Sequence, residues 1–281
     1  MATPEEPPGD IPELFGLERS RLVELLATVG ESDWHRPSPC PEWTVLGLCA
    51  HLAGTDLSLL ARHRDHYLGT PSPDGLTETE FIEWLDELQM EWVRGARRLS
   101  PRLVTDLLAW TGPQVVDALR RIEPMPGPAR VSWAGPDGVP GWLDQVRELS
   151  ECWIHRQQLL QALGRAPDLR PELAGPILEG LRWAYPFRLQ QIRAEPGDTV
   201  SIDIAGPVSA TWQLVADPSG WNYQSGPGSR VVASLSMTTD EAWRLLTNNL
   251  APADQERLRV SGDARVVEVL RRTRAIIGSP R

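Results

Sequence analysis

The sequence predicts an α+β protein with a helical N-terminal part and a small mixed C-terminal part. From residue 11 to about residue 192, apolar side chains recur at intervals of three and four residues, which is the pattern of amphipathic helices. From residue 199 the pattern changes to the two-residue alternation that is typical of strands. A chain of 281 residues is long enough for two domains. We therefore expect the domain boundary near residue 195.

The first part of the chain is expected to hold one helix between two irregular segments. Residues 1–10 are rich in proline and glutamate with almost nothing to bury, so we expect a disordered tail. A first helix is expected from residue 11 to residue 29, and Gly30 ends it. Residues 33–44 contain three prolines, which forbid a helix and predict an extended loop.

Thr44 is a suitable N-cap for a second helix. The buried stripe of this helix is expected to consist of Val45, Leu48, Cys49, Leu52, Leu59 and Leu60. His51 lies beside the stripe, one turn after Leu48, so its imidazole can face the interior of a bundle. Such a histidine is either a core residue or a metal ligand, and periodicity does not distinguish the two. His63 and His66 lie among charged residues, which indicates a solvated helix end.

Two more helices are expected before the centre of the chain. Residues 70–77 are rich in turn formers, and a third helix should follow from residue 78 to residue 99. Its expected buried positions are Phe81, Leu85, Leu88, Trp92 and Val93. A shorter helix should cover residues 104–121. Residues 123–128, with three prolines, are expected to be irregular, and residues 131–138 to be extended or turn-like.

A central helix from about residue 141 to residue 163 carries two stripes. The apolar stripe consists of Trp142, Val146, Leu149, Trp153 and Leu160. The second stripe lies almost opposite and consists of Asp144, Glu148, Glu151, His155 and Gln158. Because Gln145, Arg156 and Gln157 interrupt the apolar side, the second stripe fits a solvated face and a second buried face about equally well.

The rest of the chain is expected to form a helical connector at 166–195 and a small α+β domain at 196–281. The connector contains a helix at 172–192, which should kink near Pro186. In the C-terminal domain we expect strands at 199–204, 209–215, 231–237 and 258–260, a turn at 217–220, and helices at 241–246 and 264–277. The sequence contains no glycine-rich phosphate loop, no GxSxG motif and no internal repeat.

Composition excludes several classes of function. The net charge of −10 and the pI near 5.1 argue against binding to nucleic acid or to an anionic membrane surface. All 28 basic residues are arginine, scattered along the chain. The three cysteines, at positions 40, 49 and 152, form no CxxC motif and fit reduced thiols in a cytoplasmic protein. The first residues resemble neither a signal peptide nor a transit peptide, and no apolar run approaches the ~18 residues of a membrane span.

Glu151 and His155 form the most informative pair in the sequence. Their four-residue spacing on a helix places a carboxylate and an imidazole on one face, with Cβ atoms roughly 5–6 Å apart. Both groups can therefore bind one metal ion. The strongest candidate for a third ligand is His51, about a hundred residues earlier. Two histidines and one glutamate would leave a fourth position open, which distinguishes a catalytic zinc site from a structural one.

Two segments carry a resemblance to a known family. PSPCPEWTVLGLCAHLAG at 37–54, followed by ELSECWIHRQQLLQALG at 148–164, resembles the mycothiol-dependent maleylpyruvate isomerase family, a branch of the DinB-like metalloenzymes. The tail at 259–280 is also similar to the C-terminal domain of such proteins. The resemblance implies a DinB-like four-helix bundle at residues 11–165 followed by the small α+β domain. It also implies a divalent metal, zinc above all, held by His51, Glu151 and His155.

The resemblance further implies a thiol-dependent enzyme. In this family the metal binds the thiol of mycothiol as a thiolate, which then attacks a small electrophile. The attack either isomerises an unsaturated keto acid or transfers the thiol to the electrophile. The expected partners are therefore a low-molecular-weight thiol and a small molecule, in a cytoplasmic monomer or homodimer. Two alternatives are a metal-binding protein without turnover and a zinc hydrolase that activates water.

Two departures from the family leave roles open. Many relatives carry Asp three residues after the second metal-binding histidine, and here that position is Gln158. We favour the transferase over the isomerase partly for this reason. The isomerase also uses an arginine of its C-terminal domain, for which Arg230, Arg244 and Arg265 are all candidates.

Overall fold

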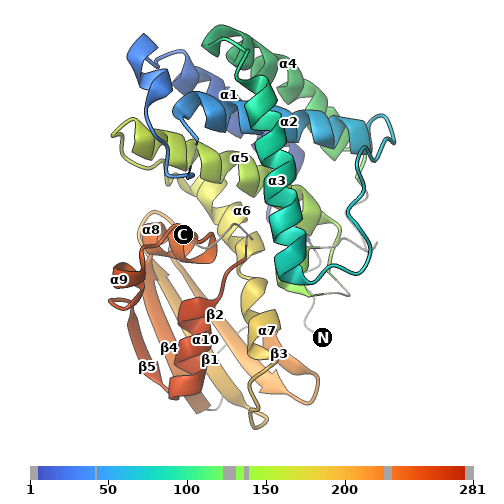
Figure 1. Cartoon of the computed structure of the whole chain (residues 1–281). Coiled ribbons are helices and arrows are strands. Elements are labelled where there is room, and N and C mark those ends of the chain that lie inside the picture. The colour runs from blue at the N-terminus through green and yellow to red at the C-terminus, as the bar shows by residue number, and fades with distance from the viewer. Residues whose placement is uncertain (1–5, 42, 123–130, 136–138, 225–229, 276–281) are drawn as a thin grey trace. The chain divides into compact units, whose positions relative to one another are not determined.

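The computed structural model describes residues 6–41, 43–122, 131–135, 139–224 and 230–275 (Figure 1). Its fold is mixed α+β, with a helical N-terminal part and a five-stranded sheet, which confirms the predicted fold class. The chain divides into two compact units. The helical unit consists of Gly9–Met125 and Asp144–Asp168, and the sheet unit consists of Met1–Pro8, Pro126–Leu143 and Leu169–Arg281. The domain boundaries expected from the sequence stay a prediction.

The helical unit contains most of the long helices. Its elements are α1 (Ile11–Leu26), the 3-10 helix η1 (Glu31–His35), α2 (Val45–His63), α3 (Glu78–Ala96), α4 (Pro101–Leu119) and α5 (Trp142–Ala162). The hydroxyl of Thr44 accepts a hydrogen bond from the backbone N–H of Gly47 at 3.2 Å, so Thr44 is the N-cap of α2 as predicted. The segment 33–44 was expected to be an extended loop. Its first three residues are instead the end of η1, which stops at His35, two residues before Pro37.

Buried ion pairs join the helices of this unit. Arg19 of α1 donates to Asp56 of α2 at 2.7 Å, and Thr111 of α4 donates to the same carboxylate. Arg156 of α5 binds both carboxylate oxygens of Glu18 in α1, at 2.5 and 2.7 Å. The four charged side chains of these two pairs are at most 5% exposed. Each is therefore stabilised by an opposite charge that compensates for lost hydration.

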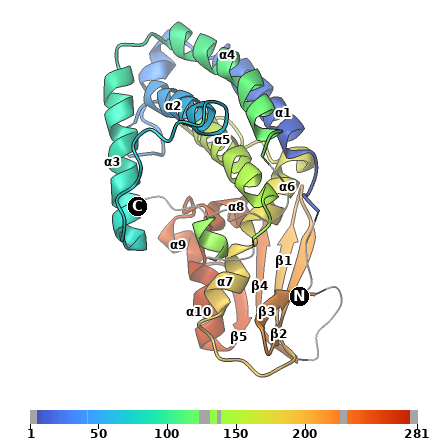
Figure 2. The same cartoon turned by 90° about the vertical axis from the view of Figure 1, so that its right-hand side faces the viewer.

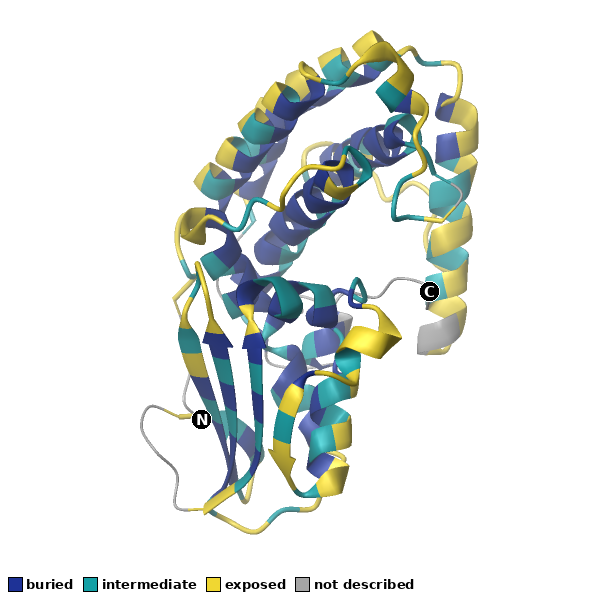
Figure 3. Ribbon diagram, turned by 90° about the vertical axis from the view of Figure 1, so that its left-hand side faces the viewer, coloured by how far each residue is buried: buried dark blue, intermediate teal, exposed yellow. Residues whose placement is uncertain are grey.

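The polar stripe of α5 is a second buried face. Glu148 and Gln158 are each 3% exposed, and Asp144, Glu151 and His155 are half-buried. Opposite them, Trp142, Leu149 and Trp153 are at most 2% exposed. Helix α5 thus packs on two sides, which Figure 3 shows by its mainly blue and teal colour. The solvated-face interpretation of this stripe is wrong.

Helix α3 departs from its expected burial. Of its predicted core positions, Val93 is buried, whereas Leu85, Leu88 and Trp92 are half-buried and Phe81 is 36% exposed. The main contacts of α3 are with α2, and the indole N–H of Trp92 donates to the carbonyl of Ala50 at 2.7 Å. Periodicity identified the apolar side of α3 correctly, but the bundle covers only part of that side.

The sheet unit is built on five strands in the order β3-β2-β1-β4-β5. Its elements are η2 (Ser132–Ala134), α6 (Pro171–Leu181), α7 (Ala184–Leu189), β1 (Asp198–Ala205), β2 (Ala210–Asp217), β3 (Gly220–Tyr223), β4 (Arg230–Thr238), α8 (Thr239–Leu246), α9 (Pro252–Gln255), β5 (Arg259–Gly262) and α10 (Ala264–Arg272). Strands β1 and β4 are parallel, and the other neighbours are antiparallel. Helices α7, α8 and α10 lie on one face (Figure 2), where Val200, Ile202 and Leu235 are fully buried.

Several boundaries in the sheet unit differ from expectation. The helix expected at 172–192 breaks at Arg182 and Trp183, and Pro186 lies inside the first turn of α7, where a missing N–H costs little. Strand β3 and the one-turn helix α9 were not expected. Helix α10 ends at Arg272 because Thr273 is extended. The expectations for 1–5, 123–128, 136–138 and 276–277 lie outside the described residues.

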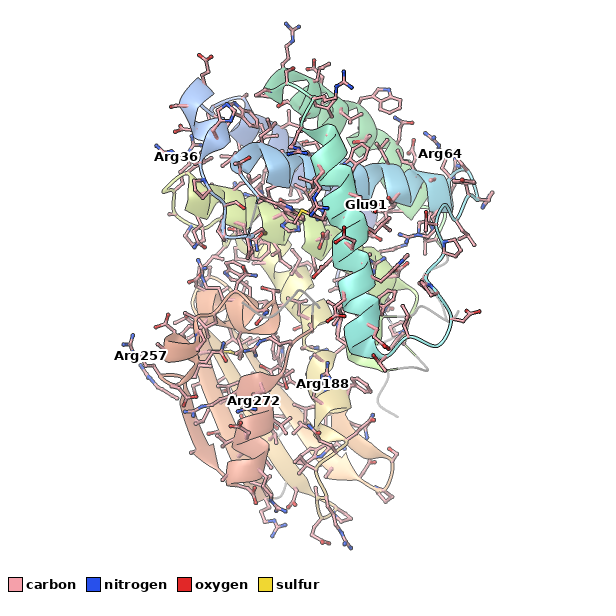
Figure 4. All side chains as sticks on the ribbon, in the orientation of Figure 1. Arg36, Arg64, Glu91, Arg188, Arg257 and Arg272 are labelled. Carbon is pink, nitrogen blue, oxygen red and sulfur yellow. The ribbon has the colours of Figure 1, made fainter. Side chains whose placement is uncertain are left out.

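Charge is distributed over both units. Figure 4 labels Arg36 and Arg64 on the helical unit and Arg257 and Arg272 on the sheet unit, and each of these arginines is paired with an acidic side chain nearby in sequence. In the part of the chain that the structure describes, no helix combines the length and the apolar character that crossing a membrane requires.

Candidate metal centre

The structure brings His51, Glu151 and His155 together inside the helical unit. Nε2 of His51 lies 2.9 Å from Oε1 of Glu151, and Nε2 of His155 lies 3.1 Å from the same oxygen. The potential ligand atoms of all three lie within 4.8 Å of one another. Among the described residues this is the one group of three or more metal-binding side chains. The role of these residues as ligands stays a prediction.

Local sequence explains how the three side chains meet. Glu151 and His155 are four residues apart on α5 and so share a face. His51 follows Leu48 on α2, close to the fully buried stripe, and is 5% exposed. Helices α2 and α5 lie side by side in both cartoon views (Figures 1 and 2). The rings of His51 and His155 meet nearly edge to face, with centroids 4.8 Å apart.

The electrostatics show one carboxylate shared by two imidazoles. Burial tends to raise the pKa of Glu151, but the charges and hydrogen bonds of His155 and His51 hold it well below its usual value. Burial alone would lower the pKa of His155. The charge of Glu151 and the hydrogen bonds with Cys40 and Glu151 outweigh burial and raise this pKa to about 10. Burial lowers the pKa of His51. The cluster therefore holds positive charge beside Glu151, which is the charge that a cation would supply.

The donor set fits a divalent metal. Two histidines and one glutamate are one of the ligand sets found in catalytic zinc sites. Cys40 does not add a fourth ligand in this arrangement. Its Sγ lies 4.0 Å from Nδ1 of His155, on the side of the ring away from Nε2 and Glu151. Among the described residues, the side chains that could hold one metal ion together are therefore those of His51, Glu151 and His155.

Gln158 lies behind His155. Its Oε1 is 2.7 Å from Nδ1 of His155 and accepts a hydrogen bond from the thiol of Cys40 at 3.0 Å. The sequence analysis left the role of Gln158 open and missed Cys40. Cys40 lies in the same motif as His51, but 118 residues separate it from Gln158 in the chain. The spacing of apolar residues along the sequence gives no indication of such a contact.

The ring of Trp43 packs beside His51, and Trp92 packs against the same helix at Gly54. The ring of Trp43 lies 4.6 Å from the imidazole, and its indole N–H donates to Sδ of Met90 in α3 at 3.3 Å. Trp92 lies against Gly54, where a Cβ atom would come within 2.4 Å of the indole. The loop before α2 and the helix α3 thus meet next to the candidate centre.

One turn before Glu151 on α5, Glu148 anchors two arginines. Its carboxylate is 3% exposed and binds Arg147 at 2.5 Å and Arg62 of α2 at 3.1 Å. Arg147 also donates to Asp144 at 2.8 Å. This cluster joins the end of α2 to α5 and fixes the helix on which two of the predicted ligands lie.

The other histidines and the candidate arginines have partners or exposure of their own. His63 accepts a hydrogen bond from Arg62, and His35 and His66 are exposed. In the sheet unit, Arg230 pairs with Asp198, Arg244 with Asp240 and Arg265 with Asp263. Which of the three arginines contacts a substrate stays open.

Comparisons with known proteins identify the family of the helical segment. Residues 15–160 match the family model described as mycothiol maleylpyruvate isomerase N-terminal domain, and this range contains all three predicted ligands. The uncharacterized proteins MT0041 and Rv0036c of Mycobacterium tuberculosis are each 24% identical over 213 residues, which cover 73% of this chain and 76% of the relative.

Two solved structures share the fold. A crystal structure of the mycothiol-dependent maleylpyruvate isomerase has a TM-score of 0.50 and 17% identity. A crystal structure of a mutant of that enzyme has a TM-score of 0.51 and 16% identity. Each comparison covers 90% of this chain and 93% of the other. At this identity the likeness shows the fold alone.

Proposed function

Because the chain belongs to the mycothiol maleylpyruvate isomerase N-terminal domain family, we propose that it is a metal-dependent enzyme that uses mycothiol as a thiol cosubstrate. Its second substrate is a small electrophile, and the reaction is transfer of the thiol or isomerisation of an unsaturated keto acid. The observation that carries the proposal is the convergence of His51, Glu151 and His155 within the segment that matches the family.

The three residues would hold a divalent metal, with zinc as the first choice. His51 and His155 would bind through Nε2, and Glu151 would bind through a carboxylate oxygen. When bound, the metal would supply a positive charge that lowers the pKa of a coordinated thiol and so favours its nucleophilic form. Glu151 is the one anion of the set, so it leaves part of the charge of a dication uncompensated for that purpose.

Transfer and isomerisation differ in the fate of one bond. In both reactions the thiol loses its proton and its sulfur forms a bond to a carbon of the electrophile. In transfer that bond persists in the product: a leaving group departs with the electron pair of its bond, or the electron pair of the attacked double bond takes up the proton that the thiol lost. In isomerisation a double bond becomes single, rotates and forms again as the same thiolate leaves. We favour transfer, because Gln158 stands where relatives carry Asp.

The test is the absorption spectrum of cobalt-loaded protein. Cobalt–thiolate bonds absorb in a charge-transfer band that cobalt–water bonds lack. We expect mycothiol to produce the band with the wild-type chain, and mercaptoethanol to produce it only at much higher concentration. His155→Ala protein is the control, because it lacks one ligand and should give no band.

The outcomes separate the competing functions. A cobalt-loaded chain whose spectrum no thiol changes would contradict the thiol-dependent function. Hydrolytic turnover of an ester or amide without thiol would then support a water-activating zinc hydrolase. Metal binding without either activity would support a non-catalytic metal-binding protein.

A further inference from the structure

Gln158 makes a pair of contacts that the proposed chemistry does not yet use. It is 3% exposed, and its Oε1 lies within hydrogen-bond distance of two groups from different parts of the chain. One is Nδ1 of His155, at 2.7 Å, and the other is the thiol of Cys40, at 3.0 Å. A carbonyl oxygen has two lone pairs, so both groups can donate to it together.

We propose that Gln158 is the positioning residue of the candidate metal centre and that it acts through His155 and Cys40. Its oxygen accepts the Nδ1–H of His155, so Nε2, the nitrogen beside Glu151, is the one that would bind a metal. The same oxygen accepts the thiol hydrogen of Cys40, which keeps the sulfur behind the imidazole. This inference rests on the proposed function only in assuming that a metal binds at the centre.

The tautomer follows from the donors and acceptors present. An amide oxygen accepts hydrogen bonds and donates none, so a neutral His155 that is bonded to it must carry its proton on Nδ1. Nε2 is then unprotonated and available to a metal. Metal-binding histidines usually donate their other N–H to a carboxylate, a carbonyl or water in this way.

The two histidines of the centre are held differently. Nδ1 of His51 is buried and has no hydrogen-bond partner among the described residues, and the ring rests against the indole of Trp43. His51 is therefore held by packing and by Glu151, whereas His155 is held by Glu151 and by Gln158. For this reason the loss of the Gln158 oxygen should affect one ligand and leave the other in place.

A neutral acceptor has a chemical consequence. A carboxylate behind His155 would add a negative charge to the centre and make the imidazole a stronger donor to the metal. The amide of Gln158 positions the ring without that charge. The metal then retains more positive charge for an incoming thiol.

Two substitutions at position 158 separate positioning from packing. Gln158→Leu has a similar volume but no acceptor, and we expect it to weaken zinc affinity about 10- to 100-fold, as is usual for loss of such a partner. Gln158→Glu keeps an oxygen at the same reach, and we expect it to retain zinc as tightly as the wild type or more tightly. Zinc affinity is measured by competition with a chromophoric chelator, in the absence of thiol.

Gln157→Leu is the matched control on the same helix. Gln157 is 2% exposed, and its Oε1 accepts a hydrogen bond from the backbone N–H of Asp168 at 2.8 Å, away from His155. This change should lower the melting temperature without changing zinc affinity. Equal loss of zinc affinity in Gln157→Leu and Gln158→Leu would overturn the positioning role, and so would an unchanged affinity in Gln158→Leu.

Cys40→Ala tests where the sulfur lies. With Cys40 behind the imidazole, cobalt-loaded wild-type protein without added thiol should lack a sulfur charge-transfer band, and Cys40→Ala should change zinc affinity less than threefold. A band that is present before thiol is added and is lost in Cys40→Ala would mean that Cys40 is a ligand, which overturns the proposal. None of these measurements needs turnover. A chain without enzyme activity whose variants show the expected zinc affinities would therefore contradict the proposed function but support this inference.

Discussion

His51, Glu151 and His155 contribute differently to a bound cation. His51 is the most buried of the three and comes from a different helix, so a metal held by all three would join α2 to α5. Glu151 supplies the only negative charge. We expect purified protein to contain about one equivalent of zinc, since three ligands define one site. His51→Ala and His155→Ala should lose most of it, and Glu151→Gln should bind it more weakly. Elemental analysis that finds equal metal in the wild type and all three variants would end the metal proposal.

The buried pair of Arg19 and Asp56 makes a second prediction at the level of single residues. Asp56→Asn leaves a guanidinium unpaired in the core of the helical unit, so we expect a loss of about 3–5 kcal/mol in the free energy of unfolding. The control is Asp106→Asn, which removes the partner of Arg102 in a pair that is 91% and 66% exposed. Exposed pairs contribute ~1 kcal/mol or less. Denaturant titrations that give the same loss for both variants would mean that burial does not decide the strength of these pairs.

Helix α3 packs tightly against helix α2 at Gly54, where the indole of Trp92 leaves no room for a side chain. A Cβ atom there would lie 2.4 Å from Nε1 of Trp92, so Gly54→Ala must displace the indole and break its bond to Ala50. We expect a cost of about 1–3 kcal/mol, as for overpacked cores. Gly95→Ala is the control on α3, because nothing lies within 4 Å of its added Cβ. It should stabilise the protein by about 0.5–1 kcal/mol, since alanine is the better helix former. Thermal melts that rank the two variants in the opposite order would contradict this packing.

The start of α3 carries a pH-dependent cap. The hydroxyl and backbone N–H of Thr77 donate to the carboxylate of Glu80, and these hydrogen bonds lower the pKa of Glu80 below 4.5. A carboxyl group whose pKa is lower in the folded protein stabilises it above the unfolded pKa. This stabilisation is lost as the pH falls through the folded value. In NMR titrations Glu80 should therefore have its midpoint below 4.5, and Thr77→Ala should raise it while Thr77→Ser should not. A midpoint that Thr77→Ala leaves unchanged would remove the cap as the cause.

At the scale of the whole molecule, metal should stabilise one unit and not the other. The predicted ligands all belong to the helical unit. Free zinc at 1,000 times its dissociation constant would add about 4 kcal/mol to the stability of that unit. Calorimetry in zinc and in chelator should therefore show one transition that moves and one that does not, and His155→Ala should abolish the movement. A single transition that shifts as a whole would contradict independent unfolding of the two units.

The sequence predicted the long helices and the grouping of His51, Glu151 and His155, and it did so for physical reasons. The helical period shows which side of a segment is apolar. The cap at Thr44 and the four-residue spacing of Glu151 and His155 each involve residues close together in the sequence, so both can be recognised without the fold. Period does not show how much of an apolar side a neighbour covers, so Phe81 was wrongly expected to be buried. Strand β3 has only four residues, which is too short for an alternation to be recognised. The contact between Cys40 and Gln158 depends on the folded chain and has no local signal.

The path of the chain through the helical unit also has a consequence for biosynthesis. The unit consists of two stretches, and α5 completes it only after residues 126–143, which belong to the sheet unit, have been made. At ribosomal speeds of about 5–20 residues per second, His51 leaves the peptidyl-transfer centre roughly 5–20 s before Glu151 and His155 are joined to the chain. During that interval the nascent chain contains His51, Cys40 and Cys49 but not yet Glu151 and His155. A metal that needs all three predicted ligands would therefore bind only after the first four helices of the chain have been made.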